Sequence, residues 1–272
     1  MILRFPDVRS ALIETDKIGA SSEKDLESHP YRKLRNAGPQ EREQLYEQAY
    51  DRHAHDAALD PAAIPEWNAR RRRRLRLYRR IMGAHARDVL EVGCGTGDLT
   101  CALARTAPHV VAIDLSSREL RLARMRAERY PELASRIEFF RMNAVRLEFA
   151  DASFDFSVST SMIEHLHPDD VDRHLREVWR VLRPGGRYLV WCPNRLGHHK
   201  DRPFHLCMMS HRDLRARMAA AGFRSFRSPA LRGLPMVGTS FKIAMESAMA
   251  ALRIPILWSH LGVRNVMIVA EK

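Results

Sequence analysis

The stretch "VLEVGCGTGDLT", residues 89–100, places three glycines at alternating positions directly behind an apolar run. The apolar run predicts a buried strand, and the residues after the glycines predict the start of a helix. A glycine lets the chain turn sharply and lets a ligand approach the backbone itself. The stretch therefore predicts a ligand crevice at the carboxyl end of the first strand of an open α/β sheet.

From Arg87 onward, apolar runs alternate with amphipathic stretches, which is typical of a parallel sheet covered by helices on both faces. We expect a Rossmann-like open parallel sheet whose last strand is antiparallel. Ser116 and Ser210 are predicted to open two of the covering helices, and Gly222 to close the second. The predicted strands are 88–92, 109–114, 136–142, 154–160, 186–192 and 264–270.

Two regions outside this alternation complete the predicted organisation. Residues 1–65 have weak periodicity and several Pro and Gly breaks, so we expect an N-terminal arm or lid before a main domain over 66–272. The apolar, methionine-rich residues 228–262 predict a substrate cap. A chain of 272 residues with 45% hydrophobic residues can bury one such core.

The cysteines and the N-terminus predict a cytoplasmic protein. The four cysteines form no CxxC pair, which favours neither a zinc site nor a disulfide framework. Arg4, Asp7 and Arg9 interrupt the N-terminal residues before an apolar leader can form, and no run reaches the ~20 apolar residues of a membrane span.

A formal net charge of +12 raises the question of an anionic partner. The charge is concentrated in "RRRRRLRLYRR", residues 70–80. Consecutive residues on a helix step by ~100°, so these arginines point around most of the circumference and make no single stripe. We therefore favour a solvated surface helix, packed by Leu75, Tyr78 and Met82, over a nucleic-acid or anionic-lipid site.

The glycine loop does not match the dinucleotide fingerprint GxGxxG, because Asp98 stands where the third glycine is expected. An acidic group beside a helix N-terminus competes with a pyrophosphate for the same amides. The next predicted strand, "HVVAIDLS", ends in Asp114, whose carboxylate can accept hydrogen bonds from both hydroxyls of a ribose. The pattern predicts a nucleoside ligand without phosphates. Alternatively, Asp114 only opens the following helix.

Four segments together resemble the class I S-adenosylmethionine-dependent methyltransferases, especially their small-molecule and quinone branch: "EVGCGTG", "AIDLS", "FDFSVSTSMIEHL" and "LRPGGRYLVWCPN". The resemblance covers about residues 85–225 and implies S-adenosyl-L-methionine as cofactor. It implies that the glycine loop surrounds the methionine part, that Asp114 holds the ribose and that Leu115 packs on the adenine. Asn143 stands where the family usually has aspartate. The implied cofactor-binding residues are Glu91, Gly93, Gly95, Gly97, Asp114, Leu115, Asn143, Ala144 and Ser159.

A sulfonium methyl group is already activated, so the protein needs mainly to align it with the acceptor and to exclude water. A base is needed when the acceptor arrives protonated. Glu164 and His165 follow the fourth predicted strand, and a histidine there can accept a hydroxyl proton near neutral pH. The alternative is that both residues only form a turn. His167 is more typical of a helix edge without function.

The same segment raises a metal question through the resemblance. In small-RNA 3′-terminal 2′-O-methyltransferases and ubiquinone-biosynthesis O-methyltransferases, an ExxEH pattern here is linked to metal binding. Ser161 occupies the first glutamate position of this chain, which leaves Glu164 and His165, with His205 as a distant partner. Losing a carboxylate removes a hard, charged ligand. We therefore expect no metal.

These patterns predict an enzyme that methylates a small, hydrophobic acceptor, lipid-like or quinone-like, on oxygen. The fourth strand lacks the NPPY-type ending of enzymes that methylate exocyclic amines of bases, which disfavours base N-methylation. The alternatives are an RNA 3′-terminal 2′-O-methyltransferase that uses the basic helix, and a cofactor-binding protein without catalysis. Lys242, Glu246 and Arg253 interrupt the apolar segment near the C-terminus, which fits peripheral membrane contact better than a span.

Overall fold

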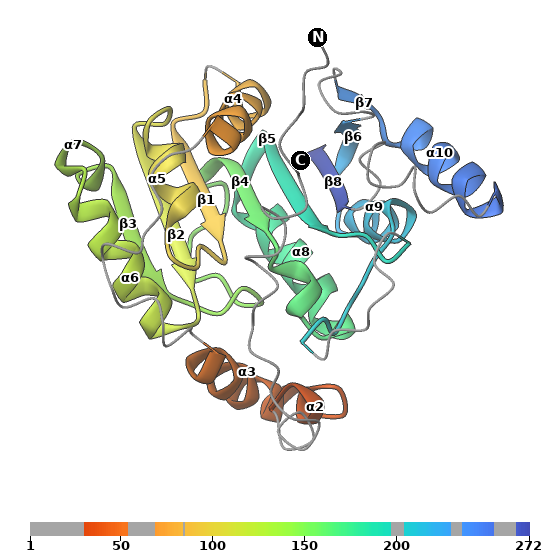
Figure 1. Cartoon of the computed structure of the whole chain (residues 1–272), viewed down its shortest axis with the longest axis horizontal. Coiled ribbons are helices and arrows are strands. Elements are labelled where there is room, and N and C mark those ends of the chain that lie inside the picture. The colour runs from red at the N-terminus through yellow and green to blue at the C-terminus, as the bar shows by residue number, and fades with distance from the viewer. Residues whose placement is uncertain (1–29, 54–68, 84, 197–203, 230–235, 253–264) are drawn as a thin grey trace, which may run out of the picture.

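The computed structural model describes residues 30–53, 69–83, 85–196, 204–229, 236–252 and 265–272 (Figure 1). An eight-stranded sheet runs through this part of the chain in the order β3-β2-β1-β4-β5-β8-β6-β7. Strands β1 to β5 are parallel, and β8 is antiparallel to both β5 and β6, which confirms the predicted fold class. The strands are β1 (Asp88–Val92), β2 (His109–Asp114), β3 (Ile137–Arg141), β4 (Phe154–Thr160), β5 (Leu182–Pro193), β6 (Arg224–Pro229), β7 (Met236–Gly238) and β8 (Asn265–Glu271).

Helices cover both faces of the sheet because successive strand residues point to opposite sides. Leu90 belongs to a buried cluster with residues of α3, α8 and α9, whereas its neighbour Val89 belongs to a cluster with residues of α4, α5 and α7. The helices are α2 (Pro30–Leu34), α3 (Pro39–His53), α4 (Ala69–Met82), α5 (Asp98–Ala104), α6 (Ser117–Glu128), α7 (Pro131–Ala134), the 3-10 turn η4 (Ile163–His165), α8 (Pro168–Val181), α9 (His211–Ala220) and α10 (Thr239–Leu252).

The strand order places the two functional segments at one edge. The chain leaves β1 toward β2 and β3 and returns to the other side of β1 as β4. Such a reversal opens a crevice at the carboxyl ends of the two central strands. The glycine loop follows β1, and the segment with Glu164 and His165 follows β4. The fold therefore brings the predicted cofactor loop and the predicted catalytic segment together.

The C-terminal part departs from the sequence prediction. Strands β6 and β7 were not expected; they pair antiparallel with each other, and β6 also pairs with β8. Four of the six residues of "RSFRSP" in β6 are polar, and β7 is only three residues long, so neither shows the apolar run of a buried strand. The predicted cap over 228–262 contains the end of β6, β7 and α10, and its residues 230–235 and 253–262 lie outside the described residues. Its role over a substrate stays a prediction.

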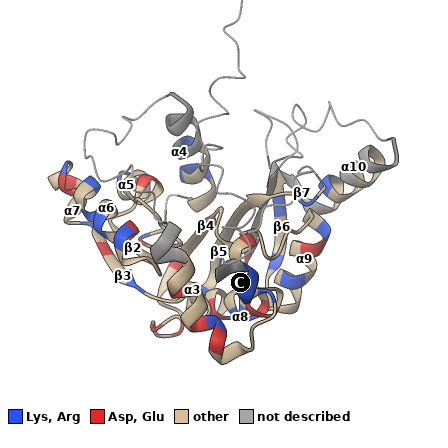
Figure 2. Ribbon diagram, turned by 60° about the horizontal axis from the view of Figure 1, so that its bottom comes forward, with Lys and Arg blue, Asp and Glu red and all other residues tan. Residues whose placement is uncertain are grey.

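The arginine run lies on α4, as predicted, and the second half of this helix packs against the sheet. Tyr78, Ile81 and Met82 are buried against the sheet, while Arg79 and Arg80 are exposed. The side chains of residues 70–75 lie outside the described residues. Elsewhere on the described helices, basic and acidic residues are interspersed (Figure 2).

The predicted arm is more ordered than its sequence indicated. Its residues 30–53 form α2 and α3, and Leu45, Tyr46 and Ala49 are buried in the same cluster as α8. Figure 1 shows both helices beyond the lower end of the sheet. Residues 1–29 and 54–65 of the predicted arm lie outside the described residues.

The described part of the chain also bears on the expectations about the cysteines and about membrane spans. All four cysteines are buried and none forms a disulfide. No described helix combines the length and the hydropathy that crossing a bilayer requires.

Candidate active site

The three glycines of the loop after β1 have different tasks. A Cβ on Gly93 would lie 2.5 Å from Met162 Cγ, and one on Gly97 would lie 2.9 Å from Ala123 Cβ. Both glycines also have a positive φ, 75° and 76°, which side chains rarely adopt. Gly95 differs, because the nearest atom to its added Cβ, Glu119 Oε2, is 3.7 Å away. Two glycines thus serve packing of the chain, whereas Gly95, whose φ of 49° is also positive, leaves space where a Cβ would lie.

Asp114 organises the loop as well as the crevice. Its Oδ2 accepts a hydrogen bond from the Gly95 N–H at 2.9 Å, and its Oδ1 accepts one from the Ser116 N–H at 2.9 Å. The cap of α6 is Ser116, whose Oγ accepts from the Glu119 N–H at 3.3 Å. Asp114 is therefore not the helix cap. Each carboxylate oxygen has a further lone pair, which the predicted ribose contact would use.

The crevice is acidic although the chain as a whole is basic. Burial, together with the Asp114 charge, raises the pKa of Glu91 to about 8. The Thr100 hydroxyl donates to Glu91 Oε2 at 2.5 Å, and this hydrogen bond lowers the pKa by less than burial raises it. Burial and the same Asp114 charge also raise the pKa of Glu119. The charge of Asp114, with Glu119 beside it, favours a cationic ligand and disfavours phosphates, whereas Glu91 is protonated at neutral pH. A molecule with a sulfonium, an ammonium and no phosphate fits this lining.

Asp98 contributes less to this exclusion than the sequence suggested. It forms an ion pair with Arg126, whose guanidinium also donates to Thr96 Oγ1 at 3.3 Å. Its charge is therefore balanced locally, and the carboxyls of Asp114 and Glu119 disfavour phosphates instead.

The raised pKa of Glu91 predicts a pH dependence of stability. An unfolded glutamate ionises near its ordinary value of 4.5, while folded Glu91 keeps its proton to about pH 8. The folded state therefore binds one more proton between these values, so this group makes the free energy of unfolding fall as pH rises. We expect Glu91→Gln to reduce the loss of stability between pH 5 and pH 8, measured by urea unfolding of the cofactor-free protein.

The exposed Glu128→Gln on α6 is the control for this measurement and should keep the wild-type slope. The comparison with a control is needed because other groups also make stability depend on pH. Burial lowers the pKa of His174 from its ordinary 6.5 to about 4, so between these values His174 makes the free energy of unfolding rise with pH. An unchanged slope in Glu91→Gln would contradict a buried, protonated Glu91.

A buried polar chain lies beside the predicted adenine position and was not found from the sequence. Ser159 Oγ and the Tyr188 hydroxyl are 2.7 Å apart, and this hydroxyl is 2.7 Å from His174 Nε2. His174 Nδ1 donates to the Ala144 carbonyl oxygen at 2.9 Å. Ser159 is 1% exposed, so its side chain faces this core chain. One signal in the sequence could have indicated this chain. Ser159, His174 and Tyr188 are polar residues at positions where the strand and helix patterns predict apolar ones.

The other residues implied for the adenine lie at the ends of β2 and β3. Leu115 is half-buried, and its carbonyl accepts from Arg141 Nε at 3.0 Å. Asn143 Oδ1 accepts from the Val145 N–H at 3.1 Å, which leaves a second lone pair on this oxygen and the amide nitrogen as groups for a ligand. Contact of these residues with the cofactor stays a prediction.

The segment after β4 presents Glu164 and His165 together. Ser161, which opens it, has a φ of 52°, and η4 follows. His165 Nδ1 lies 2.9 Å from the Phe204 carbonyl oxygen and donates to it in the tautomer that keeps the lone pair on Nε2, and the Ser161 backbone is a second hydrogen-bond partner of the ring. Burial lowers the pKa of His165. The ring is therefore neutral at physiological pH and can accept a proton at Nε2.

Glu164 is buried, and its Oε2 has no hydrogen-bond partner among the residues that the structure describes. Burial raises its pKa to about 8. Glu164 Oε1 lies 3.9 Å from His165 Nε2, and the donor atoms of Glu164, His165 and His205 all lie within 4.8 Å of one another. The structure thus brings together the residues that the sequence proposed as an alternative metal site, and these donors could bind a divalent cation. The expectation of no metal stays a prediction.

His167 has a structural position. It is the N-cap of α8, with Nδ1 accepting from the Asp169 N–H at 3.3 Å. This position agrees with the interpretation of His167 from the sequence as a histidine at the edge of a helix.

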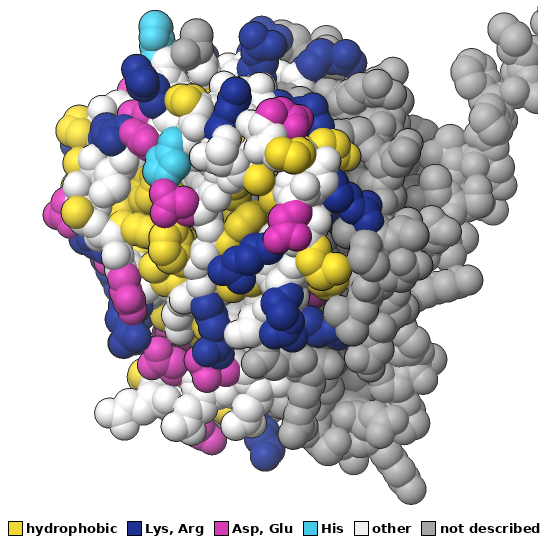
Figure 3. Space-filling view, turned by 90° about the vertical axis from the view of Figure 1, so that its left-hand side faces the viewer, with side chains coloured by type: hydrophobic (Ala, Val, Ile, Leu, Met, Phe, Trp, Pro, Cys, Tyr) yellow, Lys and Arg dark blue, Asp and Glu magenta, His cyan; other side chains and the backbone are white. Residues whose placement is uncertain are grey.

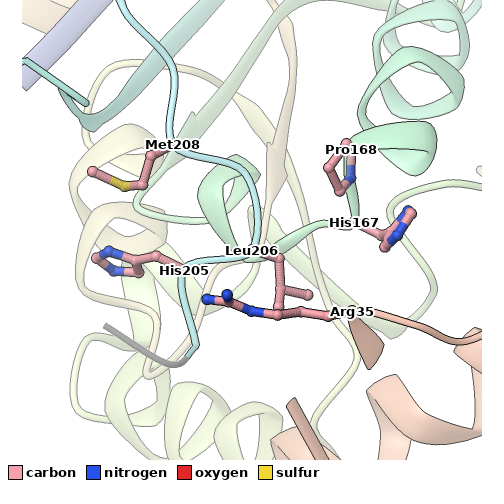
Figure 4. Close-up of a pocket in the computed structure, with 6 residues that line it drawn as sticks. All are labelled: Arg35, His167, Pro168, His205, Leu206 and Met208. Carbon is pink, nitrogen blue, oxygen red and sulfur yellow. The ribbon is translucent and has the colours of Figure 1, made fainter. Parts of the chain in front are cut away.

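A pocket of about 380 Å³ lies beside the histidines (Figure 4). Its lining comes from both the arm and the main domain: Arg35, His167, Pro168, His205, Leu206 and Met208. Because His205 also belongs to the Glu164 cluster, the pocket and the candidate base are adjacent.

The arm is held to this segment by a buried ion pair. Arg42 Nε lies 2.9 Å from Asp170 Oδ2, and both side chains are 4% exposed. The Tyr46 hydroxyl donates to Asp170 Oδ2 at 3.1 Å and accepts from the His167 N–H at 2.6 Å. At the other side of the crevice, Glu47 lies 3.1 Å from Arg141, the residue bonded to the Leu115 carbonyl. Helix α3 therefore spans from the predicted adenine side to the candidate base.

Removing the Tyr46 hydroxyl tests this attachment. Tyr46→Phe leaves the His167 N–H without its acceptor, and an unsatisfied buried donor costs about 1–3 kcal/mol. We expect residues 30–53 to become more sensitive to proteolysis, measured by limited digestion and mass spectrometry. Tyr130→Phe, on the far side of α6, is the control. Equal digestion of both variants would mean that Tyr46 does not hold the arm.

Comparison with known proteins gives matches to the central part of the chain. Residues 90–190 match the family described as "Methyltransferase domain". A protein of Mycolicibacterium smegmatis named as a probable S-adenosylmethionine-dependent methyltransferase is 38% identical over 153 residues, 54% of this chain and 55% of that protein. An O-methyltransferase of Aspergillus nomiae is 33% identical over 123 residues, 42% of this chain and 53% of that protein.

The fold is also found among solved structures. An S-adenosylmethionine-dependent methyltransferase from Archaeoglobus fulgidus superposes with a TM-score of 0.54 at 16% identity, covering 74% of this chain and 92% of that one. The chain spans about half the length of the curated relatives it matches.

Proposed function

We propose that the chain transfers a methyl group to an oxygen atom of a small, mostly apolar acceptor, because residues 90–190 are a class I S-adenosylmethionine-dependent methyltransferase domain. S-adenosylmethionine is the cofactor of this domain class, as the motifs predicted. The observation that carries the choice of oxygen is the neutral His165, whose Nδ1 is bonded to a carbonyl and whose ring centroid lies 5.3 Å from that of His205, a residue that lines the pocket.

Three features support this proposal. The acidic crevice fits a cationic ligand that carries no phosphate, and the missing side chain of Gly95 leaves space beside it. The pocket has apolar walls at Pro168, Leu206 and Met208. A relative at 33% identity is named an O-methyltransferase.

The proposed reaction is a displacement at carbon. S-adenosylmethionine supplies a methyl group bonded to a sulfonium, so no further activation of that carbon is needed. The acceptor oxygen bonds to the methyl carbon as the carbon–sulfur bond breaks, and the bonding pair stays on sulfur as a neutral thioether. The acceptor hydroxyl proton passes to His165 Nε2. Glu91 and Asp114 hold the cofactor in line, and α3 excludes water from one side.

A second candidate is methylation of an RNA 3′-terminal 2′-hydroxyl, which the approach of Glu164, His165 and His205 favours. The charge distribution favours it less. In the view of Figure 3, Lys and Arg side chains are interspersed with Asp and Glu and do not form a continuous basic strip. A cofactor-binding protein without catalysis is the third candidate.

One experiment separates these candidates without a guess at the acceptor. The full chain is incubated with a cell extract and deuterated-methyl cofactor, and labelled small molecules and labelled RNA are identified by mass spectrometry. Label in a small molecule as a methyl ether or ester supports the proposal. Label in RNA ends, with affinity that falls steeply with salt, supports the second candidate. Tight cofactor binding with no label in either fraction would overturn both.

A further inference from the structure

We propose that His174 is a positioning residue for the adenine of the cofactor, and that it acts by holding the Ala144 carbonyl oxygen on the segment after β3. The His174 side chain is fully buried, so it acts through the backbone of this segment and not by contact with the cofactor. The inference rests on the predicted place of the adenine beside Asn143. It holds whichever acceptor is methylated and so goes beyond the proposed function.

The segment that joins β3 to β4 borders the crevice beside Asp114. The Met142 N–H donates to the Asp114 carbonyl oxygen at 3.1 Å, so the segment begins next to the residue predicted to hold the ribose. Asn143 follows and offers a lone pair on Oδ1 to a base. Residues 142–153 form no helix or strand, so their backbone groups need partners on other elements. The position of this wall therefore depends on the elements to which it is bonded.

Helix α8 supplies such partners from one polar face. His174, Glu177 and Arg180 are spaced three residues apart, which places them on the same side of the helix. Glu177 Oε2 accepts from the Leu147 N–H at 2.8 Å, and Arg180 Nη2 donates to the Leu147 carbonyl oxygen at 2.7 Å. Arg180 Nη1 donates to the Phe149 carbonyl oxygen, also at 2.7 Å. These bonds fix the later part of the segment, and His174 holds the part that directly follows β3.

The buried chain around His174 sets which ring nitrogen carries the proton. A carbonyl oxygen only accepts, so Nδ1 donates to Ala144 and Nε2 accepts from the Tyr188 hydroxyl at 2.7 Å. The Tyr188 hydroxyl in turn accepts from Ser159 Oγ. Burial lowers the pKa of His174 to about 4, so the ring is neutral at physiological pH. The direction of each hydrogen bond in the chain is therefore set, and the chain ends on the Ala144 carbonyl.

The test separates the two hydrogen bonds of His174 in the full chain. His174→Asn keeps an amide N–H near the position of Nδ1 and loses the bond to Tyr188. His174→Gln keeps a polar group near the position of Nε2 and loses the bond to Ala144. Tyr188→Phe removes the hydroxyl and leaves Nδ1 donating to Ala144. The control is Arg176→Gln, an exposed position on α8.

The measured quantity is the preference of each protein for S-adenosylhomocysteine over S-inosylhomocysteine, determined by calorimetry. In the second ligand an oxo group replaces the adenine amino group, so the preference reports contacts at the edge of the base. We expect wild-type protein to prefer S-adenosylhomocysteine roughly tenfold, as for one hydrogen bond to the base. His174→Asn, Tyr188→Phe and Arg176→Gln should keep this preference, whereas His174→Gln should reduce it to about twofold.

A merely structural role of His174 gives a different pattern. His174→Asn, His174→Gln and Tyr188→Phe each break a buried hydrogen bond, so each should lower the free energy of unfolding in urea. If stability alone mattered, the two His174 variants would lose the preference equally. The preference for S-adenosylhomocysteine over its 2′-deoxy analogue should stay at the wild-type value in His174→Gln, because Asp114 and not this segment is predicted to hold the ribose.

Two results would overturn the inference: equal binding of the adenine and inosine compounds to wild-type protein, and equal loss of the preference in His174→Asn and His174→Gln. If a His174 variant does not fold, Tyr188→Phe decides. A retained preference in Tyr188→Phe supports the inference and a lost preference overturns it, because the bond to Ala144 is intact in that protein. The experiment uses no acceptor, so a failure of the proposed oxygen methylation leaves its result unchanged.

Discussion

Asp114→Ala is expected to weaken S-adenosylhomocysteine binding at least tenfold, measured by calorimetry. The substitution would remove two charge-assisted hydrogen bonds to the ribose, each contributing on the order of 1.5–3 kcal/mol before water compensates. It would also remove the acceptor of the Gly95 N–H, which holds the glycine loop at 2.9 Å from the carboxylate. Both losses lower affinity, so the affinity alone does not separate the ribose contact from the loop contact.

An analogue separates them. In wild-type protein, 2′-deoxy S-adenosylhomocysteine should bind more weakly than the parent compound, because one hydroxyl partner of Asp114 is missing. In Asp114→Ala the two compounds should bind equally, since the contact is already lost. The control is Asp151→Ala, whose exposed carboxylate is bonded to Arg180 away from the crevice. An unchanged dissociation constant in Asp114→Ala would remove the ribose assignment.

The fold was predicted from the sequence where local and global signals agree. The buried strands β1, β2 and β4 carry apolar runs that match their boundaries in the structure, and Ser116 and Ser210 cap α6 and α9 as expected. The sequence prediction began the fifth strand at 186, whereas β5 begins at Leu182, with an irregular register between Phe154 and Phe156. A glycine-containing start with a shifted register does not show the period of a regular strand.

The helices of the arm were not predicted because their signal is mostly tertiary. Helix α3 buries Leu45, Tyr46 and Ala49, but its ion pair joins Arg42 to Asp170, a residue 128 positions away. No local pattern shows that an arginine will be buried, since an isolated charge would be costly without its partner. The Tyr188 and His174 chain was missed for the same reason, because its partners lie on different elements.

The candidate site divides in the same way. Motif residues on adjacent strand ends, Glu91 and Asp114 among them, could be placed from sequence because parallel strands end at one edge. The role of Gly95 could not be separated from those of Gly93 and Gly97 without the distances to Met162 and Ala123. Arg35 had no motif at all, and only the docking of the arm places it in the pocket.

The largest expected effect concerns His165. As a general base, His165→Gln should retain cofactor affinity and reduce turnover of the labelled acceptor by roughly 10²–10⁴, the usual contribution of a positioned base. Activity of the wild-type enzyme should fall as pH falls through the pKa of His165, which burial places below its ordinary 6.5, and this acidic limb should be absent in the variant. Full turnover in His165→Gln would leave this histidine a structural turn residue.

Metal catalysis at the same cluster predicts a different set of results. Glu164→Gln should then reduce turnover as strongly as His165→Gln, because the amide is a poorer ligand, and His205→Ala should do the same. With a general base, Glu164→Gln should be nearly neutral, because the pKa of about 8 keeps the carboxyl protonated at neutral pH, and His205→Ala should alter the acceptor KM more than kcat. Since Ser161 supplies no carboxylate to the cluster, we expect chelator to leave wild-type activity unchanged. Loss of activity in chelator with recovery on adding a divalent ion would assign the cluster to a metal and favour the RNA 3′-terminal candidate.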